Sequence, residues 1–569
     1  MKKIHIQTKR LCALAVLALA GLLTATAADF VVDGISYNVI GENEVEVTKP
    51  DEGKYEGEVV VPSSVVNDGV TYQVKHIGVG AFSYCADLLQ VEISEGVTEI
   101  KRNAFSSCRN LQSVEFPNSL ERIEEYVFTY CYALTNFYFP KNVSYINQDA
   151  FYICPNVTSF MCSGLNPYFK SVNGVMYSKD MTKLLFYPSA AAATTFDVPS
   201  TVTRIESNAF SSNDNLVEIT FPEGLTWLSN RALSNCDNLV SIELPDALQH
   251  ISAMNFSYCD NLSHVKLPAS LDTICNGVFM GLPSLHELVI PRNVKYIDEF
   301  AFTESDGLQK VTFEEGSLLD GIGSRAFEYC TSLDNFIMPN SATWMGGQIF
   351  GYCRSLKTFH LSDNLTQMNL SNFLECTSLV EGEIPGKVEW VKNAFVDCPL
   401  LKRVKFGDKD SAPGVTLLKN CTVVRCPEVE YIELGANIDS LEFLAFSGVN
   451  KLKVVICWAA MPPRCLQSLS SAFSPSPDQL NATLYVPEAS LEAYRTAYVW
   501  KDFPAIAAIE RVGDLNCNGS LDVTDATTMI NLLMGDDPGE LAPYADVNLD
   551  GRIDITDITT LIGLVLGGQ

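Results

Sequence analysis

The pattern of hydrophobic and polar residues along this chain repeats with a period of 23 residues. Alternation of apolar and polar residues is typical of a short strand that buries one face, and a spaced apolar pair after it predicts the next turn. Phe105 and Cys108 precede this pattern and predict a buried return segment on the other side. In the copy that begins at Ala104, the apolar positions that follow are Leu111, Val114, Phe116, Leu120 and Ile123.

Copies of the pattern recur over most of the chain. A fixed period of this size predicts a solenoid, because one unit cannot bury its apolar face alone and stacked neighbours build the core. The copies begin at Ala81, Ala104, Val127, Ala209, Ala232, Asn255, Val278, Ala301, Ala326, Ile349, Asn372 and Ala394, with looser copies from Cys421 and Ala445.

The segments around the repeats predict caps and one interruption. Residues 28–76 show strand alternation and the turn sequence Asn67-Asp68-Gly69, which predicts a small N-terminal β cap. Within a solenoid over 77–482, residues 163–208 predict a β-rich insertion with a hairpin turn at Asn173-Gly174. Residues 483–510 predict a strand, a short helix and an aromatic plug, because a solenoid end needs a cap with a polar outer face.

The cysteines follow the repeat. Several are spaced by 23 residues, which indicates that the period places them rather than pairing. We expect buried, reduced thiols that act as small apolar residues, with a disulfide framework as the alternative. Removing Cys12 with the N-terminal segment leaves an odd number of the 18 cysteines, so at least one is free or intermolecular. The periodic ones are Cys85, Cys108, Cys131, Cys154, Cys236, Cys259, Cys330, Cys353 and Cys376.

The repeat unit resembles the BspA type of leucine-rich repeat, whose units read roughly A-F-x-x-C-x-x-L-x-x-V-x-[LF]-P-x-x-[LV]-x-x-I. The resemblance covers about residues 77–468. It implies a leucine-rich repeat solenoid of the α/β type, with short strands and irregular or short helical returns. It also implies binding of host or matrix proteins, although the repeats do not identify the ligand.

The first residues have the pattern of a secretory signal peptide. Lys2, Lys3, Lys9 and Arg10 precede a short apolar run, and small residues follow up to Ala27, after which we expect cleavage. A later apolar segment long enough to span a membrane is not found in the sequence. The net charge of −29 argues against nucleic acid as a partner. We therefore expect a secreted or cell-surface protein.

Residues 514–525, DLNCNGSLDVTD, alternate acidic or amide residues around a glycine, and 546–557, DVNLDGRIDITD, repeat the pattern. A calcium loop supplies oxygen ligands from positions 1, 3, 5, 7, 9 and 12, with glycine at position 6. An N-terminal helix cap would explain Asp522 or Asp554 but not the alternation before it. The predicted ligands are Asp514, Asn516, Asn518, Ser520 (carbonyl), Asp522 and Asp525, then Asp546, Asn548, Asp550, Arg552 (carbonyl), Asp554 and Asp557.

Position 12 is aspartate rather than glutamate, and each loop leads into an apolar helical segment. This duplicated loop and helix resembles a type I dockerin, over residues 511–569. The resemblance implies a small all-α domain that two calcium ions fold and that binds a cohesin module. Loop positions 10 and 11 contact cohesin in that family, which implies contacts by Val523 and Thr524 and by Ile555 and Thr556, and keeps a two-fold docking mode open.

The outward strand positions of the repeats form an extended face, roughly 70 Å long at about 4.8 Å per strand, suited to a protein or polymer. Its middle, Val289 to Ile337, is less charged than its ends, for which ordinary surface variation is the favoured interpretation. A localised binding patch is the alternative.

The sequence has no G-x-S-x-G motif, no H-E-x-x-H motif and no phosphate-binding glycine loop. The histidines are dispersed, and the pair Glu92 and Glu115, which imitates a glycosidase carboxylate pair, is explained by repetition. We therefore expect a non-enzymatic adhesion or scaffold protein with calcium as its cofactor. The alternative is a carbohydrate-binding or hydrolytic component of a cellulosome-like polysaccharide-degrading assembly.

Overall fold

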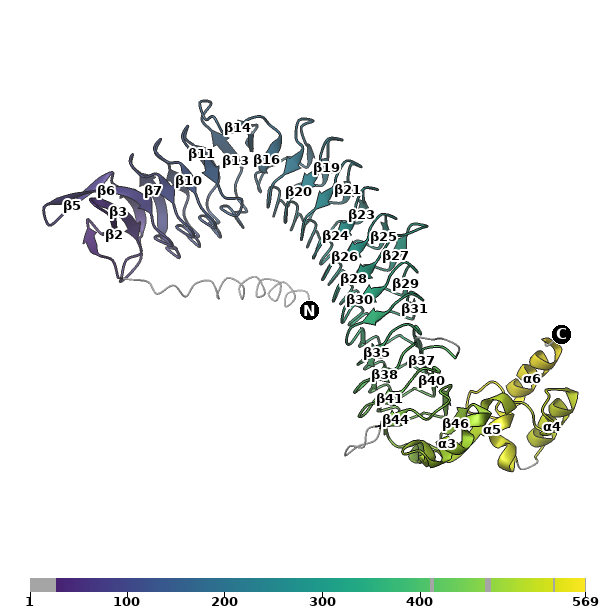
Figure 1. Cartoon of the computed structure of the whole chain (residues 1–569). Coiled ribbons are helices and arrows are strands. Elements are labelled where there is room, and N and C mark those ends of the chain that lie inside the picture. The colour runs from purple at the N-terminus through teal and green to yellow at the C-terminus, as the bar shows by residue number, and fades with distance from the viewer. Residues whose placement is uncertain (1–26, 410–413, 466–471, 536–537, 568–569) are drawn as a thin grey trace. The chain divides into compact units, whose positions relative to one another are not determined.

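The computed structural model describes residues 27–409, 414–465, 472–535 and 538–567 (Figure 1). The predicted signal peptide lies outside the described residues, apart from Ala27. The chain forms two compact units, the first of residues 1–180 and 186–190 and the second of residues 181–185 and 191–569. Within the described part of the chain, no helix is both long and apolar enough to cross a membrane.

The first unit opens with the predicted β cap. An antiparallel hairpin joins β5 to β6 through Asp68 and Gly69, whose φ angles of 50° and 81° are those of a tight turn. Strand β6 then pairs in parallel with the second strand of the first repeat, through Ile77 and Ile100. The cap thereby continues directly into the solenoid. Its strands are β1 (Phe30–Val32), β2 (Ile35–Gly41), β3 (Glu44–Thr48), β4 (Gly57–Val61), β5 (Ser64–Asn67) and β6 (Val70–Ile77).

Each repeat forms one coil with two short parallel strands joined by turns. Residues 23 apart pair between coils, as Val91 does with Val114 and Ile123 with Ile146. In the first unit the first strands are β7 (Leu88–Ile93), β9 (Ser113–Glu115), β11 (Asn136–Phe139) and β13 (Ser159–Cys162). The second strands are β8 (Glu99–Ile100), β10 (Arg122–Ile123) and β12 (Tyr145–Ile146).

The insertion contains the predicted hairpin. Strands β14 (Phe169–Val172) and β15 (Val175–Ser178) are antiparallel, and Val172 pairs with Val175 across the turn. Asn173 and Gly174 take φ angles of 51° and 79°, as a two-residue hairpin turn requires. The next strand is β16 (Lys183–Phe186).

The coils of the second unit are built in the same way, with two short parallel strands in each. The first strands are β17 (Thr195–Asp197), β19 (Glu218–Thr220), β21 (Ser241–Glu243), β23 (His264–Lys266), β25 (Glu287–Ile290), β27 (Lys310–Phe313), β29 (Asn335–Ile337), β31 (Thr358–His360), β34 (Glu381–Ile384), β37 (Arg403–Phe406), β40 (Tyr431–Leu434) and β43 (Val454–Cys457). The second strands are β18 (Arg204–Ile205), β20 (Trp227–Leu228), β22 (His250–Ile251), β24 (Thr273–Ile274), β26 (Tyr296–Ile297), β28 (Gly321–Ile322), β30 (Trp344–Met345), β32 (Gln367–Met368), β35 (Trp390–Val391), β38 (Leu417–Leu418), β41 (Ser440–Leu441) and β44 (Arg464–Cys465).

From residue 373 onward the returns also pair, in a third row of strands. The returns of the earlier described coils are turns rather than helices, so the irregular form that the repeat pattern allowed is the one observed. The third row is β33 (Phe373–Leu374), β36 (Phe395–Val396), β39 (Val423–Val424), β42 (Phe446–Ser447) and β45 (Phe473–Ser474).

Two ladders of side chains run through the core of the coils. Phe82, Phe105 and Phe128 stack in parallel, with ring centroids 4.9 and 5.4 Å apart. Beside them, the buried thiol of Cys108 donates a hydrogen bond of 2.9 Å to the carbonyl of Phe82 in the preceding coil. Equivalent bonds recur along the chain, as between Cys353 and Phe327 at 3.1 Å. The 23-residue spacing of the cysteines therefore follows from a repeated contact between coils, and burial raises the pKa of the Cys108 thiol to about 12.

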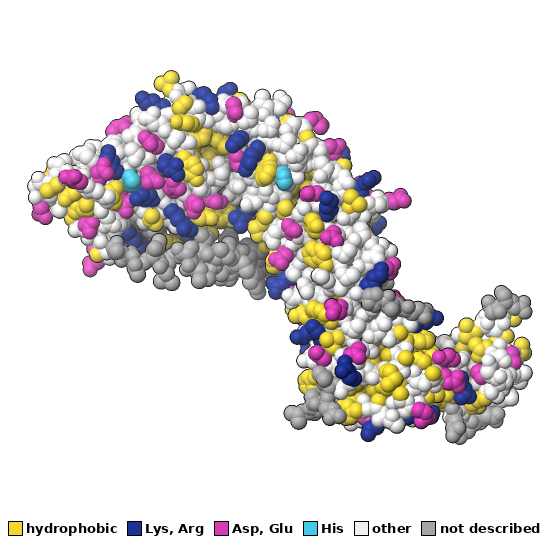
Figure 2. Space-filling view, in the orientation of Figure 1, with side chains coloured by type: hydrophobic (Ala, Val, Ile, Leu, Met, Phe, Trp, Pro, Cys, Tyr) yellow, Lys and Arg dark blue, Asp and Glu magenta, His cyan; other side chains and the backbone are white. Residues whose placement is uncertain are grey.

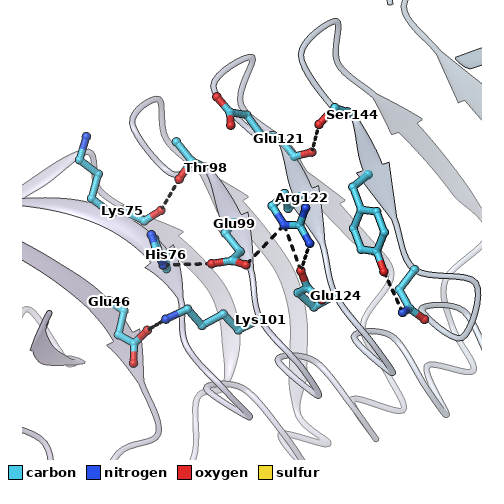
Figure 3. Close-up of polar contacts among 12 residues, drawn as sticks. Glu46, Lys75, His76, Thr98, Glu99, Lys101, Glu121, Arg122, Glu124 and Ser144 are labelled. Carbon is cyan, nitrogen blue, oxygen red and sulfur yellow. Dashed lines mark hydrogen bonds and ion pairs between the residues drawn. The ribbon is translucent and has the colours of Figure 1, made fainter. Parts of the chain in front are cut away.

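The second strands of the first unit carry a row of charged side chains (Figure 3). Glu99 lies 3.3 Å from His76 and 3.8 Å from Arg122, which also pairs with Glu124 at 2.7 Å. His76 is half-buried, and burial lowers the pKa of its ring, with the nearby Lys101 lowering it further. This histidine thus belongs to a structural row of polar and charged side chains. Figure 2 shows acidic and basic side chains interspersed over much of the visible surface.

The second unit ends in a cap and a helical tail. The cap contains α2 (Pro477–Leu480), β46 (Thr483–Val486), η1 (Glu488–Ser490), α3 (Leu491–Thr496), η2 (Trp500–Asp502), β47 (Ala505–Ala508) and η3 (Ile509–Arg511). Trp500, fully buried, donates from its indole to the carbonyl of Pro463, so it forms the predicted aromatic plug. The tail contains α4 (Val523–Leu533), η4 (Gly539–Leu541), α5 (Ala542–Ala545) and α6 (Ile555–Gly567).

Candidate functional site

The first candidate site is loop one, residues 514–525. The Asp514 carboxylate accepts hydrogen bonds from the backbone N–H groups of Asn518 and Gly519, both at 3.0 Å. The amide oxygen of Asn516 accepts from the Asn518 N–H at 2.9 Å. Gly519 has a φ of 84°, a conformation that glycine adopts without strain. The alternating acidic and amide residues therefore fold around one tight turn.

Loop two, residues 546–557, repeats this geometry. The Asp546 carboxylate accepts from the N–H groups of Asp550 at 3.0 Å and Gly551 at 2.8 Å. Gly551 has a φ of 80°. The Arg552 side chain is exposed, as expected for a residue that would offer only its carbonyl oxygen.

The twelfth residue of each loop is fully buried and ties the loop to its helix. Asp525 accepts from the N–H groups of Leu515 and Asn516 at 2.9 and 3.0 Å, and its other oxygen accepts from Asp522 at 2.9 Å. Asp557 likewise accepts from Asn548 at 3.1 Å through one oxygen and from Asp554 at 2.8 Å through the other.

The ninth residue of each loop also caps a helix. Asp522 accepts from the Thr524 N–H at 2.7 Å and forms a reciprocal capping box with Asp525. Asp554 accepts from the Thr556 N–H at 2.8 Å. Helix capping and the alternation upstream are therefore both present, so the two interpretations of the sequence describe different parts of one motif.

The donor set of each loop fits a calcium ion. Carboxylate, amide and carbonyl oxygens are the ligands that calcium prefers. Within the described ranges, no group of three His, Cys, Asp or Glu residues is arranged to hold a metal, and the carboxylates accept backbone hydrogen bonds instead. Burial raises the pKa of Asp546 to about 6, against the backbone hydrogen bonds that lower it. A carboxylate destabilised in this way is stabilised by a bound cation.

The residues at loop positions 10 and 11 lie on the surface at the helix starts. Val523 and Ile555 are 69% and 74% exposed. The hydroxyls of Thr524 and Thr556 bond within their own loops, each accepting from the Asn516 or Asn548 amide at 2.5 or 2.8 Å. An apolar side chain is therefore the freely available group in each pair.

The two loop-helix halves share one small core. Equivalent residues of the two halves meet there, and α4 packs against α6. The core consists of Leu515, Ala526, Met529, Ala545, Val547 and Leu561, with Leu532, Tyr544, Ile553, Ile558 and Val565 packed against it.

The outward face of the first strands carries a hollow where the sequence is least charged. A cavity of about 560 Å³ lies over β27 and β29, and its lining includes Phe313, Ile337 and Pro339. Ile337 is 66% exposed. At other positions the face mixes charged side chains with exposed apolar ones such as Tyr138 and Val289, and Glu92 pairs in register with Glu115 as repetition predicts.

A second hollow, of about 390 Å³, lies over the second strands and was not predicted from the sequence. Gly323 and Gly346 form part of its lining. A Cβ atom at these positions would lie 2.5 and 2.4 Å from the backbone of the neighbouring coil, so the coils pack closely there because both residues are glycine. Its other lining residues are Asn276, Asp298, Glu299, Ser324, Trp344 and Asn369. Two glycines in register beside a tryptophan were the signal in the sequence.

Comparison with known families gives two matches. The model of the BspA type leucine-rich repeat region matches residues 65–171, 180–309, 272–402 and 391–477, with six copies. The model of the dockerin type I domain matches residues 512–566. Neither family is catalytic, and both are typical of extracellular or cell-surface proteins. No curated protein matches the chain.

Solved structures of bacterial repeat proteins also match. A leucine-rich repeat protein from Eubacterium ventriosum is 22% identical, with a TM-score of 0.47 over 57% of this chain and 93% of its own. One from Bacteroides ovatus is 23% identical, with a TM-score of 0.42 over 75% and 94%. The pneumococcal vaccine antigen PcpA is 15% identical, with a TM-score of 0.31 over 85% and 99%.

Proposed function

Because the chain belongs to the BspA-type leucine-rich repeat family and carries a type I dockerin domain, we propose that it is an exported, non-enzymatic adhesion or scaffold protein. The repeats recognise a protein or polymer outside the cell, and the dockerin attaches the chain to a cohesin-bearing partner. The observation that carries this proposal is the duplicated loop. Asp514 and Asp546 lie 32 residues apart, and each accepts hydrogen bonds from the backbone N–H groups of the fifth and sixth residues of its own loop.

Calcium is the cofactor of this proposal, with one ion in each loop. The ligand residues predicted from the sequence would hold the ion, and its positive charge would balance the negative charge of the clustered carboxylates. Val523 and Ile555 then contact the cohesin as the apolar part of each recognition pair. Their exposure supports this role.

The test is binding of the full chain to an immobilised type I cohesin module, with calcium and with a chelator. We expect calcium-dependent binding that Val523→Asp combined with Ile555→Asp abolishes, with Val289→Asp on the solenoid as the control. Binding that persists in the chelator, or that the double variant leaves intact, would contradict the proposed attachment.

The solenoid's protein ligand is expected at the hollow over β27 and β29. Exposed apolar residues in a hollow are typical of a protein contact, and Ile337 is the most exposed of them there. The full chain should bind less extracellular matrix protein when it carries Ile337→Asp. The control is Tyr138→Asp, at an exposed aromatic in the equivalent strand position of the first unit, which should leave capture unchanged.

A second candidate function is binding of a neutral polysaccharide in the hollow beside Trp344. An aromatic ring with carboxylates and amides around it suits a sugar, which offers C–H groups on its face and hydroxyls at its edge. Asp298 and Glu299 disfavour uronates. Trp390 in the same row has its ring covered by Lys419 at 3.7 Å and is the matched control.

Affinity electrophoresis of the full chain through gels containing soluble xylan, mixed-linkage β-glucan or galactomannan tests this candidate. Trp344→Ala should abolish any retardation, while Trp390→Ala should keep it. Release of reducing sugar from the same polysaccharides would instead establish a hydrolase and overturn the scaffold proposal.

A further inference from the structure

The outward row of the first strands changes character at its C-terminal end. In register, Glu433 is followed by Ile456, Tyr485 and Ala507 in successive strands. Along the rest of the row these positions are exposed or half-buried, yet the last three are only 3%, 1% and 1% exposed. Alternate residues of a strand point to opposite sides of a sheet, so the solenoid core does not account for this burial.

The cover comes from the tail of the same chain. Val512, Tyr544 and Leu549 pack against the cluster that contains Ile456, Tyr485 and Ala507. The Tyr485 hydroxyl also donates a hydrogen bond to the carbonyl of Pro543, at 2.5 Å, in the segment just before loop two. Both apolar and polar contacts therefore join the last coils to this part of the tail.

Loop two itself is held by a lysine of the solenoid. The Lys453 ammonium donates to the carbonyl of Asp550 at 3.3 Å and pairs with Glu430 at 2.9 Å. Its aliphatic chain covers Gly551, since a Cβ atom on that glycine would lie 2.3 Å from Lys453 Cδ. Loop two thus meets the solenoid through its turn.

Loop one, which has the same fold, lacks this contact in the described structure. The fourth residue of each loop shows the difference, because Cys517 and Leu549 adopt the same backbone conformation, with φ angles of 57° and 55°. Cys517 is exposed, whereas Leu549 packs against the solenoid cluster. All of residues 516–520 are exposed. The duplicated halves of the tail are therefore not equivalent in this chain.

We propose that the outward face formed by Ile456, Tyr485 and Ala507 is a docking surface for loop two of this chain's own tail, and that the joint closes when loop two is loaded with calcium. This rests on the proposed calcium binding. Because linkage is reciprocal, a joint that needs the loaded loop also strengthens calcium binding in loop two, by about tenfold. Loop one gains nothing from the solenoid and stays open to an outside partner.

The experiment is hydroxyl-radical footprinting of the full chain, with the oxidation of each residue measured by mass spectrometry in calcium and in a chelator. In calcium, Tyr485 should be protected. In the chelator, and in Leu549→Asp with calcium present, its oxidation should rise severalfold, because the buried ring becomes exposed. Cys517→Asp, at the same position of loop one, should leave Tyr485 protected.

A variant on the solenoid side separates loss of the joint from misfolding of the loop. Ile456→Asp should expose Tyr544 and Leu549 to oxidation and should weaken calcium binding by one of the two sites only. Val289→Asp, at an exposed position of the same row, is the control. Helix content measured by circular dichroism should still rise with calcium in both variants.

The possible outcomes distinguish failure of the docking surface, of the calcium-dependent joint and of the proposed calcium binding. Tyr485 that stays protected in Leu549→Asp, or that is oxidised in the wild-type chain with calcium, overturns the docking surface. Tyr485 that is protected equally in calcium and in the chelator, while helix content rises with calcium, overturns the calcium-closed joint alone. Absence of any calcium-induced rise in helix content overturns the proposed calcium function as well.

Discussion

The solenoid and the tail are stable for different reasons. Most coils bury a phenylalanine and many bury a cysteine against the coil before them, as Phe105 does against Phe82 and Cys131 against the Phe105 carbonyl, so cohesion comes from repeated packing. The tail has one core shared by two short halves and buries the aspartates Asp525 and Asp557. Burial of charge is costly unless it is compensated. The solenoid thus depends on contacts between neighbouring coils, whereas the buried aspartates of the tail depend on local backbone hydrogen bonds and, in the proposed function, on a bound cation.

The largest expected effect comes from charging the solenoid ladder. Phe105→Asp places a carboxylate in a fully buried site that offers it no partner among the stacked rings, at a cost of about 4 kcal/mol or more. We expect the coils around it to open, so that Cys108 and Cys131 react with a thiol reagent in the otherwise native chain. Calcium should not restore their protection. Unchanged thiol reactivity and melting would contradict the assigned register of the repeat.

Removal of calcium should unfold the tail and leave the solenoid folded, the reverse of the effect of Phe105→Asp. In a chelator the tail should lose its helices, because the loop carboxylates repel one another without the ion, while the coils keep their strands. Calorimetry of the full chain should then show that only one of two transitions depends on calcium. A single transition that shifts as a whole would show that the two regions unfold together, and the comparison between them would fail.

Most of the solenoid could be predicted from the sequence, because a fixed period places Phe105, Cys108 and their equivalents without knowledge of long-range contacts. The two acidic loops could be predicted for a similar reason, since the residues that fold each of them are local in the sequence, and their calcium binding stays a prediction. The joint could not, because Ile456 and Tyr485 occupy positions that are exposed elsewhere in the row, and their burial depends on where a distant segment folds back. The hollow beside Trp344 was missed because glycines carry no pattern of polarity.

A smaller effect should distinguish the two loops within the tail. Loop two has four aspartates, Asp546, Asp550, Asp554 and Asp557, whereas loop one has three, because Asn518 takes the place of Asp550. Ligand charge tunes the affinity of such loops, so loop two should fill first, with a roughly tenfold tighter site. Asp546→Ala should therefore reduce calcium-induced helix content in the full chain more than Asp514→Ala. Calorimetric titration of both variants checks this, and an equal or reversed loss would contradict the order.

The smallest expected effect concerns the glycine of each loop. Gly519→Ala and Gly551→Ala both force a side chain into the left-handed region, with φ of 84° and 80°, at a cost of about 1 kcal/mol each. The added methyl group has open space at Gly519 but meets the Lys453 side chain at Gly551. Gly551→Ala should therefore cost more, because it also displaces the lysine that holds loop two.

The extra cost of Gly551→Ala over Gly519→Ala distinguishes the two explanations for tighter calcium binding in loop two. If ligand charge alone sets the order, both alanine variants lose the same calcium affinity, because neither removes a ligand. If the solenoid contributes, Gly551→Ala loses more affinity, and Lys453→Ala reduces the difference between the two variants, because it removes Cγ and Cδ, two of the three Lys453 atoms that the alanine at 551 meets. The four chains to titrate with calcium are Gly519→Ala and Gly551→Ala, each with and without Lys453→Ala. Equal losses would remove the solenoid from the account of calcium binding and leave the extra aspartate as the cause.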